Sequence, residues 1–574
     1  MTMNLVQPGL SAAFPLRRSA DATLAGKLFY NDKRFDTSWQ QEGVDLFEND
    51  IFKIGRDPQS EFSIDTDTEN YVSRNHCEIY TVIYSARQHY VYVRDRRSFN
   101  GTYVNGRLIG SLENSSPGYL LNDGDVIEIK PYWQFTFRQM FQPPETPLTQ
   151  LQARECQFFK SQYRVTPRSV GQGSEAVAHL AEDVLRGKQI VCKLLTLNAL
   201  PGGCQHQERI RRALQEADTL RQLSHPNILG FIDAMCSPHT VYTFMELASG
   251  GDLWSFIIRH EEVKEFDARI ILRQVTRGLR FLHDKGIIHR DLKPENILLA
   301  NSPRLAYMRV MLSDFGACLV PNRHRMTSQV GTALYQAPEI VRKVLQTPAV
   351  DIWSLGIIAM VILLGAVDYV NDMPQIEQGS LTKFVLETLK RSQRSISNKG
   401  QEFIVRCIQI NPASRQTSEE ADRDVWFCTP EKHLPFFHKL DRRMALEFKR
   451  NTKIRPMPMD IPDFLPEITG QMKLGAAPQL LKPKRAASGT VFTTPVTIPT
   501  QVAQMASKLA ITGVRDDNPE DRARASVNET KAMEIEYHED ISFDIDFRSQ
   551  IIQDLEAFQR SSKADQILQL TDSI

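Results

Sequence analysis

The amino-acid sequence predicts a multi-domain protein in which an all-β sandwich precedes an α+β domain of two lobes and a disordered C-terminal tail. The chain has 574 residues, which at roughly 100–200 residues per domain corresponds to about two to four domains. Short β-like runs with frequent turn residues fill the first part, and helical spacing prevails after residue 163. Proline-rich sequence with few long apolar runs follows residue 440.

The domain boundaries follow these changes of pattern. Residues 1–26 are polar and small without periodicity, so we expect disorder. Residues 27–141 hold the β-like runs and the turn pairs Asn105-Gly106 and Asp123-Gly124, which predict the sandwich. Residues 142–162 begin with prolines and are interpreted as a linker. Residues 163–428 form the two-lobed domain, and residues 429–574 form an extension that is expected to be mostly disordered.

The composition excludes several classes of protein. The 69 basic and 69 acidic side chains give a formal net charge of zero, whereas non-specific nucleic-acid binding requires an excess of cations. The longest apolar run, Leu355 to Val367, is shorter than the ~20 residues that span a bilayer. We therefore expect no direct nucleic-acid partner and no membrane partner, and we interpret this run as a buried helix.

The cysteines and the N-terminus indicate an intracellular protein. The eight cysteines are scattered without any C-x-x-C pair, which argues against a disulfide framework or a zinc site and favours reduced thiols. Arg17 and Arg18 precede no apolar stretch, which argues against a secretory signal.

Two segments of the extension leave alternatives open. The basic stretch Lys482-Pro483-Lys484-Arg485 is either a nuclear import signal or simply solvated. Between residues 541 and 558 the apolar residues alternate and then recur at helical spacing. This segment docks a partner, folds against the second domain or is disordered.

Three motifs stand in order in the second domain: His289-Arg290-Asp291-Leu292-Lys293-Pro294-Glu295-Asn296, then Ser313-Asp314-Phe315-Gly316, then Ala337-Pro338-Glu339. Residues 163–428 therefore resemble the eukaryotic protein kinases. Transfer of a γ-phosphoryl group depends mainly on positioning and charge neutralisation. The resemblance implies that Asp291 is the catalytic base, that Lys293 steadies the γ-phosphate, and that Asn296 and Asp314 hold Mg²⁺. Lysine at position 293 is typical of the serine/threonine branch.

The same resemblance implies an ATP site that is assembled from the first lobe and the segment joining the lobes. It places the glycine loop at Gly171 and Gly173, and the phosphate-binding lysine and its glutamate partner at Lys193 and Glu216. The hinge comprises Met245, which is the gatekeeper, Glu246 and Leu247. The glycine loop departs from the family pattern because Ala176 stands at the third glycine position. Alanine is tolerated unless φ must be positive, so we expect an active enzyme, with a pseudokinase scaffold as the alternative.

Regulation and substrate choice are inferred from positions around the catalytic motif. Arg290 suggests control by activation-loop phosphorylation, because arginine forms charge-assisted bonds with phosphate. Thr327 and Ser328 are the candidate phosphosites, with solvated hydroxyls as the alternative. Asp252 and Glu295 stand where other kinases hold a substrate arginine, which favours protein substrates with arginine before the acceptor.

Three features are expected to be structural. Asp351 resembles the buried aspartate that braces the kinase catalytic loop. Arg415 is the expected partner of Glu339. The apolar run that begins near Leu355 is then the central helix of the large lobe.

A second ordered set lies in the first domain: Gly55-Arg56, Ser73-Arg74-Asn75-His76 and Asn100-Gly101-Thr102, followed by Asn105-Gly106. Residues 28–140 resemble the forkhead-associated (FHA) domain, a β-sandwich whose loops bind phosphothreonine peptides. A dianionic phosphate favours a guanidinium and hydroxyl donors. The resemblance implies that these come from the loops at Arg56, Ser73, Arg74 and Asn100, with Gly55, His76 and Gly101 as scaffold and Asn105-Gly106 as a hairpin turn.

The order of the two domains resembles the checkpoint-kinase-2-like family, which includes replication-checkpoint and meiosis-specific fungal members. The resemblance implies ATP and Mg²⁺ as cofactors, phosphothreonine-containing adaptor or kinase proteins as partners, self-association for trans-phosphorylation, and a nuclear and partly cytoplasmic location. Ser-Gln and Thr-Gln pairs are absent from the first 148 residues, which favours branches without such a cluster, including the meiotic one. The damage, replication and meiotic branches stay open, as does a kinase of a non-damage pathway.

Overall fold

A computed structural model describes residues 23–34, 43–48, 51–64, 70–85, 88–113, 116–142, 145–172, 176–197, 217–260, 263–301, 309–318, 333–365, 372–374, 377–391, 395–428, 433–447 and 459–465. Within them, the predicted order of a β-sandwich followed by an α+β domain of two lobes is confirmed. Residues 466–574, which include the basic stretch and the 541–558 segment, lie outside the described residues.

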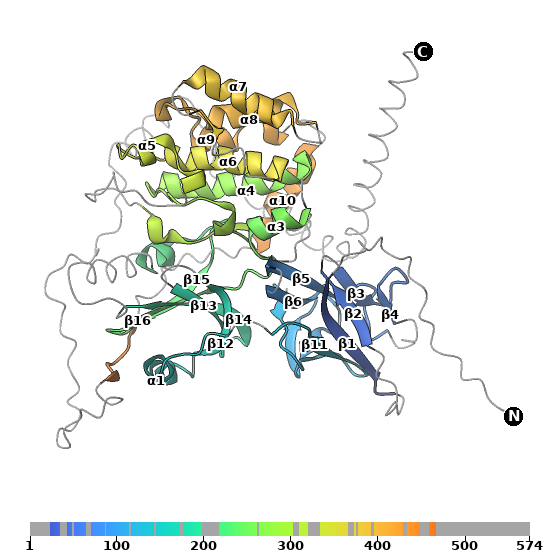
Figure 1. Cartoon of the computed structure of the whole chain (residues 1–574). Helices are drawn as coiled ribbons and strands as arrows, with labels where there is room; N and C mark the ends of the chain where they lie inside the picture. Colours follow the sequence, from blue (N-terminus) through green and yellow to red (C-terminus); the bar gives the residue numbers. More distant parts are fainter. Residues whose placement is uncertain are drawn as a thin grey trace, which may run out of the picture. The chain divides into compact units, whose positions relative to one another are not determined.

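The first domain is a sandwich of two sheets (Figure 1). Buried aliphatic and aromatic side chains such as Leu28, Ile54, Val93 and Phe137 form the core between them. One sheet has the order β2-β1-β11-β10-β7-β8 and the other β4-β3-β5-β6-β9. The strands are β1 Leu24–Asp32, β2 Gly43–Phe47, β3 Ile51–Gly55, β4 Phe62–Ser63, β5 Cys77–Ser85, β6 Gln88–Asp95, β7 Thr102–Val104, β8 Arg107–Gly110, β9 Tyr119–Leu120, β10 Val126–Ile129 and β11 Trp133–Gln139.

The hairpin of β5 and β6 is buried on both faces. Side chains alternate between the two faces of a strand, and Ile79 and Val91 contribute to the core between the sheets. The alternate positions Tyr80, Tyr90 and Tyr92 are each at most 1% exposed and belong to a different apolar cluster. A strand without polar alternation is typical of a sheet that is covered on both sides.

The segment interpreted as a linker contains a helix, α1 Gln150–Phe158. Thr149 begins it with a capping box in which the side chains and backbone of Thr149 and Gln152 bond reciprocally. Glu155 is fully buried and accepts a hydrogen bond from the Tyr242 hydroxyl at 2.7 Å. The ring of Phe159 packs edge-on against Tyr242. This segment is therefore attached to the following lobe rather than being a mere spacer.

The small lobe of the second domain is a sheet with the order β12-β13-β14-β16-β15-β19. Its strands are β12 Tyr163–Gln172, β13 Ala176–Asp183, β14 Lys188–Thr196, β15 Phe231–Cys236, β16 Thr240–Glu246 and β19 Met459–Asp460. All neighbours pair antiparallel except β15 and β19, which are parallel. Residues 217–222 are helical and pack Ala217 and Leu220 into the apolar core that continues into the large lobe.

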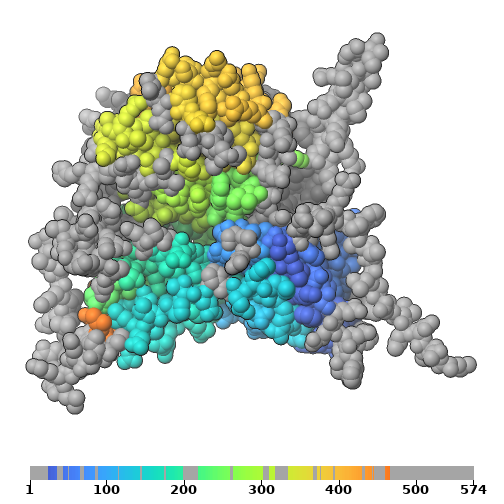
Figure 2. All heavy atoms as spheres, viewed as in Figure 1, coloured from blue at the N-terminus to red at the C-terminus, as the bar shows by residue number. Residues whose placement is uncertain are grey.

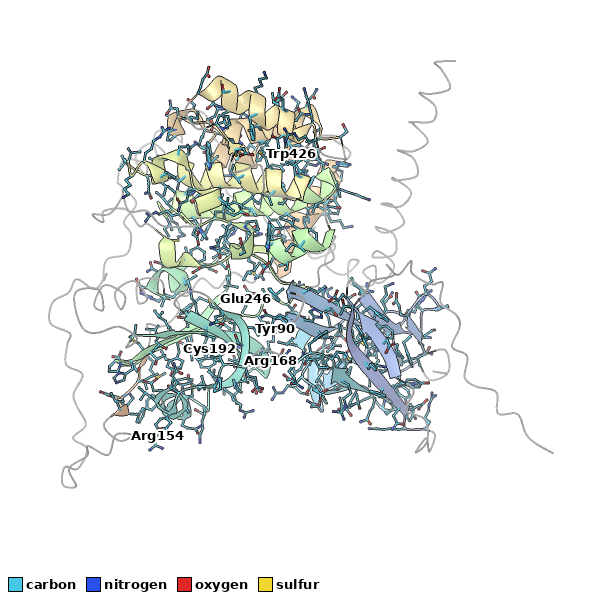
Figure 3. All side chains as sticks on the ribbon, in the orientation of Figure 1. Tyr90, Arg154, Arg168, Cys192, Glu246 and Trp426 are labelled. Carbon is cyan, nitrogen blue, oxygen red and sulfur yellow. The ribbon has the colours of Figure 1, made fainter. Side chains whose placement is uncertain are left out.

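The large lobe is mainly helical, and buried apolar side chains of its helices form one core. Figure 2 shows the outer surface of this lobe in yellow and orange. Helix α6 is buried along nearly its whole length, which confirms the central helix expected from the apolar run. Trp426, labelled in Figure 3, is 1% exposed and donates its indole hydrogen to Glu265 at 2.6 Å. The elements are α3 Leu253–His260, α4 Glu265–Asp284, β17 Ile297–Leu299, β18 Val310–Leu312, α5 Pro338–Val341, α6 Ala349–Leu364, α7 Gln378–Leu389, α8 Asn398–Cys407 and α9 Ser418–Asp422.

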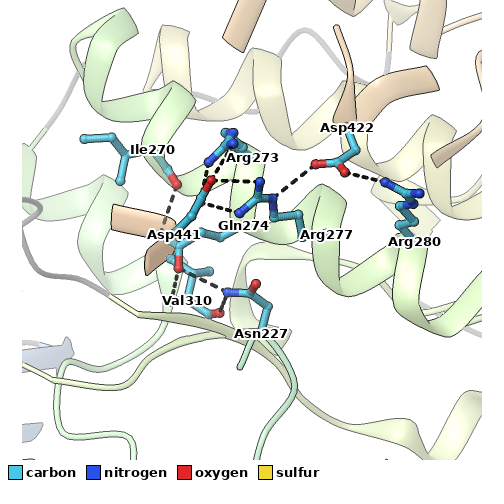
Figure 4. A network of polar contacts seen from close by, with 9 residues as sticks. All are labelled: Asn227, Ile270, Arg273, Gln274, Arg277, Arg280, Val310, Asp422 and Asp441. Carbon is cyan, nitrogen blue, oxygen red and sulfur yellow. Dashed lines mark hydrogen bonds and ion pairs between the residues drawn. The ribbon is translucent and has the colours of Figure 1, made fainter. Parts of the chain in front are cut away.

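The first part of the C-terminal extension is ordered against the kinase fold. Helix α10 (Leu434–Glu447) packs Phe437 and Leu440 beside Ile270 of α4. Asp441 accepts hydrogen bonds from Arg273 at 2.5 and 2.8 Å and also pairs with Arg277 (Figure 4). The extension was expected to be mostly disordered, and the structure differs at this helix. Its apolar residues Phe437, Leu440 and Met444 do recur at helical spacing.

Two further expectations concern the class of protein. None of the helices in the described part of the chain is long and apolar enough to cross a membrane. The described cysteines are free, and Cys77, Cys156, Cys192 and Cys407 are buried, as expected for reduced core thiols.

Candidate functional site

The catalytic motif brings the three predicted active-site side chains into contact. The loop between α4 and β17 holds Asp291, and the short 3-10 helix Pro294–Asn296 follows it. The Asn296 side-chain nitrogen donates to the Asp291 carboxylate at 3.1 Å and to its backbone carbonyl at 2.8 Å. The Lys293 ammonium lies 3.0 Å from the same carboxylate oxygen. One oxygen of Asp291 is therefore fixed by two donors.

Asp351 braces this loop, as the sequence predicted. It is fully buried at the start of α6, and its carboxylate accepts the backbone N–H groups of His289 and Arg290, each at 2.8 Å. The ring of His283 adds a third bond at 2.9 Å. Burial raises the pKa of Asp351, but the bond and the charge of His283 outweigh it, so that the pKa is lowered.

Two residues of this region have a left-handed backbone that side chains disfavour. Arg290 has a φ of 70° and Asp314 a φ of 58°. Such strain persists only where surrounding contacts over-determine the conformation. Asp351 supplies such a contact at Arg290. After Asp314, the next residue is Phe315, whose ring is 2% exposed and packs beside His289, so the chain is anchored there.

Asp314 faces the predicted phosphate-binding lysine. The Lys193 ammonium on β14 lies 3.1 Å from an Asp314 carboxylate oxygen. Burial raises the pKa of Asp314, whereas the charge and hydrogen bond of Lys193 lower it more, and the net shift is downward. The carboxylate is thus held in its ionised form, as a metal ligand must be.

The predicted nucleotide residues come from adjacent strands. Gly171 is the last but one residue of β12, and the register pairs Lys193 with Ala178 on one side and with Thr243 on the other. Met245 lies opposite Val191 and is 8% exposed. The Glu246 carboxylate accepts the Gly230 N–H at 2.6 Å, and Leu247 follows it in the hinge.

Four predicted residues lie outside the described residues: Gly173, Glu216, Thr327 and Ser328. Two neighbouring predictions concern described residues. Arg415 forms the expected bidentate pair with the buried Glu339, one oxygen at 2.5 Å and the other at 2.8 Å. At the other position, Asp252 has a raised pKa, first because of burial and also because of the nearby Glu295 charge; a preference for substrate arginine stays a prediction.

The loops of the sandwich bring the predicted phosphopeptide residues together. The backbone N–H of Arg56 donates to the Ser73 carbonyl at 3.1 Å, and the Arg56 side chain donates to the Val72 carbonyl at 2.6 Å. The Ser73 hydroxyl oxygen accepts the Phe99 N–H at 3.0 Å. The Asn100 side chain donates to the Tyr71 carbonyl at 2.9 Å. Arg56, Ser73 and Asn100 thus meet at one end of the sandwich.

Arg74 differs from these three because its side chain is 68% exposed. Its guanidinium lies 3.8 Å from a carboxylate oxygen of Asp57. His76 is fully buried, and its Nδ1 accepts the Ser73 N–H at 3.1 Å while Nε2 lies 3.2 Å from the Gly101 carbonyl. A Cβ on Gly55 would lie 2.1 Å from the Arg74 carbonyl. These contacts confirm His76 and Gly55 as scaffold.

The sequence reading missed two contributors. His283 completes the support of Asp351, and Phe99 supplies the N–H that orients Ser73. Neither residue belongs to a motif. Each contacts a residue that is distant in the sequence and is brought close only by folding. His283 had no detectable signal, whereas the position of Phe99 directly before Asn100 was a weak one.

Comparison with known proteins agrees with this geometry. A family model of the protein kinase domain matches residues 164–427, and a model of the FHA domain matches residues 52–130. The meiosis-specific serine/threonine-protein kinase mek1 of Schizosaccharomyces pombe is 28% identical over 413 residues, which cover 70% of this chain and 86% of that protein. The calcium/calmodulin-dependent protein kinase type 1 of Caenorhabditis elegans is 30% identical over 283 residues, which cover 49% of this chain and 78% of that protein.

Among solved structures, a crystal structure of Rad53 1–466 in complex with AMP-PNP has 23% sequence identity and a TM-score of 0.37, and the match covers 70% of this chain and 100% of that one. Taken with the catalytic motif and the FHA loops, the family matches identify the chain as a serine/threonine protein kinase of the CAMK group that belongs to the FHA-containing, checkpoint-kinase-2-like family.

Proposed function

We propose that this kinase acts in DNA-damage, replication or meiotic checkpoint signalling, is recruited to phosphothreonine proteins by its FHA domain, and is activated by phosphorylation of its activation loop. The observation that carries the catalytic part is the fixed carboxylate of Asp291, with Asn296 at 3.1 Å and Lys293 at 3.0 Å. The relative named as meiosis-specific supports the meiotic alternative within this proposal.

In the proposed reaction, ATP is the phosphoryl donor and a serine or threonine hydroxyl is the acceptor. Asp291 orients the hydroxyl and accepts its proton. Lys293, next to Asp291, neutralises charge on the transferred group, and Lys193 holds the phosphates from the side of β14. These residues position and neutralise, which is most of what this chemistry requires.

The donor set fits Mg²⁺. Asp314 offers a carboxylate, and the Asn296 side-chain nitrogen is bonded to Asp291, so that its oxygen is the atom suited to a metal ion. Oxygen donors of this kind are the ligands that Mg²⁺ prefers. When bound, Mg²⁺ supplies charge neutralisation for the phosphates.

The catalytic proposal is tested by transfer of radiolabelled phosphate from ATP to a protein substrate. Asp291→Asn keeps the size of the side chain and removes the base, so the rate is expected to fall about 10²- to 10⁴-fold. The matched control is Asp284→Asn at the end of α4, where the carboxylate is 69% exposed. Equal transfer by wild type and Asp291→Asn would instead indicate a phosphothreonine-reading scaffold.

The recruitment proposal is tested with phosphothreonine and unphosphorylated forms of one peptide. Wild type is expected to bind only the phosphorylated form, and Arg56→Ala to bind it at least tenfold more weakly, since a charge-assisted hydrogen bond is worth about 1.5–3 kcal/mol. Arg138→Ala, on β11 with a 55% exposed side chain, is the control. Undiminished binding by Arg56→Ala contradicts the assigned site.

The pathway and the regulation need tests in cells. Capture of partners through the FHA domain after DNA damage and during meiosis, with Arg56→Ala as control, distinguishes the checkpoint branches. Fluorescent tagging tests the proposed nuclear location. For regulation, alanine at both Thr327 and Ser328 is expected to lower activity strongly, and full activity of that variant contradicts activation by loop phosphorylation.

A further inference from the structure

The outer face of the β5–β6 hairpin is covered by the kinase domain of the same chain. Tyr80, Val82, Tyr90, Tyr92 and Leu120 form one buried apolar cluster with two kinase residues, Leu180 of β13 and Leu247 of the hinge. All five FHA side chains are at most 1% exposed. Ile51 and Tyr84 of the FHA domain also pack against this cluster, and the two kinase residues complete the cover that removes it from water.

Polar contacts fix the register of this interface at the hinge. The Tyr80 hydroxyl donates to the Ser249 hydroxyl at 3.0 Å, and Ser249 in turn bonds the Pro117 carbonyl. Ser249 is fully buried. The Tyr80 and Ser249 hydroxyls therefore both have a partner across the interface, which is the condition for burying a hydroxyl without a large cost.

A second set of polar contacts fixes the small lobe. The Gln189 side chain accepts the Leu120 N–H at 2.7 Å and donates to the Leu120 carbonyl at 3.0 Å. The Tyr90 hydroxyl donates to the Ser169 carbonyl at 2.8 Å. Arg168, 4% exposed, donates to the Leu121 carbonyl at 2.8 Å and lies 5.5 Å from the Tyr90 ring centre (both residues are labelled in Figure 3).

Two glycines show how closely the domains approach. A Cβ on Gly118 would lie 2.5 Å from both the Ser249 and the Tyr80 hydroxyl oxygens, and a Cβ on Gly251 would lie 2.6 Å from a methyl group of Val82. Both glycines also have a positive φ. Neither position has room for a side chain, so the two domains pack as closely here as the parts of a protein interior.

The chain connection favours contact within one molecule. Soon after β11 ends the FHA sandwich, Glu145 forms a β-bridge with Arg168, and the Thr146 N–H donates to the Pro167 carbonyl at 2.9 Å. The connecting segment is thus attached to β12 beside the interface. A short connection gives the two faces a high effective concentration.

The interface shares residues with the proposed nucleotide site. Leu247 is part of the predicted hinge. Two valines also pack against the cluster: Val170 directly precedes Gly171, and Val191 lies two residues before Lys193. The hinge continues as Ser249-Gly250-Gly251, and glycines give a backbone high conformational freedom. Contacts on Leu247, Ser249 and Gly251 restrict that freedom before nucleotide binds.

We propose that the outer β5–β6–β9 face of the FHA domain is an intramolecular brace for the kinase hinge, and that it tightens nucleotide binding by ordering the hinge in advance. This proposal depends on the assignment of the nucleotide site under the proposed function. Binding to an ordered site costs less conformational entropy than binding to a mobile one. The FHA domain therefore has two separate surfaces, loops that read phosphothreonine and a sheet face that supports catalysis.

The test compares nucleotide affinity of the full-length wild type with that of Val82→Glu, which places a carboxylate in the apolar cluster. Titration with a fluorescent ATP analogue is expected to show about fivefold or greater weakening, the lower end of typical coupling between sites. Leu185→Glu, at a position 81% exposed on the kinase domain, should bind like wild type. Phosphothreonine-peptide binding should be unchanged in both variants, which shows that the FHA domain is folded.

Gln189→Ala provides a second variant that leaves the apolar cluster intact and removes both bonds to Leu120. It should weaken nucleotide binding in the same direction, and hydrogen exchange should rise at residues 246–251. Nucleotide affinity within twofold of wild type in Gln189→Ala, together with raised hinge exchange, overturns the brace. A wild-type chain that binds no nucleotide would instead overturn the proposed catalytic function.

Discussion

The two proposed phosphate-directed sites of this chain are built in opposite ways. In the FHA domain, the side chains of Arg56, Ser73 and Asn100 bond to neighbouring backbone groups on loops. In the kinase domain, carboxylates are fixed by charged or multiple donors, and Asp351 beneath them is fully buried. A site that only binds tolerates exposed loops, whereas a site that positions reacting groups requires buried charge, and it should therefore lose more when one support is removed.

The largest expected effect is at Asp351. Asp351→Ala leaves the buried N–H groups of His289 and Arg290 and the ring of His283 without their acceptor. Removing one partner of a buried charged network costs about 3–5 kcal/mol, and the catalytic loop loses its brace. Urea unfolding and a phosphate-transfer assay should both show the loss, while Asp284→Ala stays near wild type. A stable and active Asp351→Ala would break the comparison.

The next effect is the response of the kinase domain to acid. Asp351 and Asp441 have folded-state pKa values below the ordinary value of 3.8, so their contribution to stability is complete above that pH and is lost as the pH falls through the lowered values. The melting temperature should fall as the pH is lowered from 5 to 3. Asp441→Asn should be less stable at pH 7 and should show a shallower fall. An equally steep fall in that variant would contradict the role given to Asp441.

An intermediate effect is expected at the FHA scaffold. His76→Ala removes both bonds of a fully buried ring, to Ser73 and to Gly101, and should cost about 1–3 kcal/mol. Phosphothreonine-peptide affinity should fall as well, because Ser73 loses its orientation. His76→Asn retains an acceptor near the Nδ1 position and should recover part of the affinity. Equal affinity in His76→Ala and wild type would show that the loop does not need this support.

The smallest effect is expected at the hairpin turn. Asn105 has a φ of 50°, which glycine adopts freely, so Asn105→Gly mainly removes the side-chain bonds to Asp125 and to the Val126 N–H. The expected loss of stability is about 1 kcal/mol. Peptide affinity should be unchanged, because this turn belongs to the scaffold. A clear fall in affinity would extend the binding site to this turn.

Much of the candidate site was predictable from the sequence, since its chemistry lies in short motifs. The proposed catalytic residues Asp291 and Asn296, the proposed metal ligand Asp314 and the supporting Asp351 belong to motifs with characteristic residue types at fixed spacing. The pair of Arg415 and Glu339 was also predicted across a long separation, because the family pattern links both positions. The folded chain then brings Lys193 to Asp314, far away in the sequence.

What the sequence could not predict depends on partners that are distant in the chain. Helix α10 packs against α4, where Asp441 meets Arg273 and Arg277, and α1 packs against the sheet that carries Tyr242. The cover on β5 and β6 did leave a signal, since Tyr80, Val82, Tyr90 and Tyr92 occupy the face that is commonly polar in a sandwich. That signal indicates a covered face but does not say what covers it.

The last described strand has a practical consequence for dividing this protein into fragments. β19 pairs in parallel with β15, the Ile461 N–H donates to the Cys236 carbonyl at 2.7 Å, and His239 pairs with Asp463 at 2.8 Å. A fragment that stops at residue 427, where the kinase family match ends, would leave β15 as an open edge. Unpaired strand edges promote aggregation, so a fragment that extends through residue 465 should be the more soluble of the two.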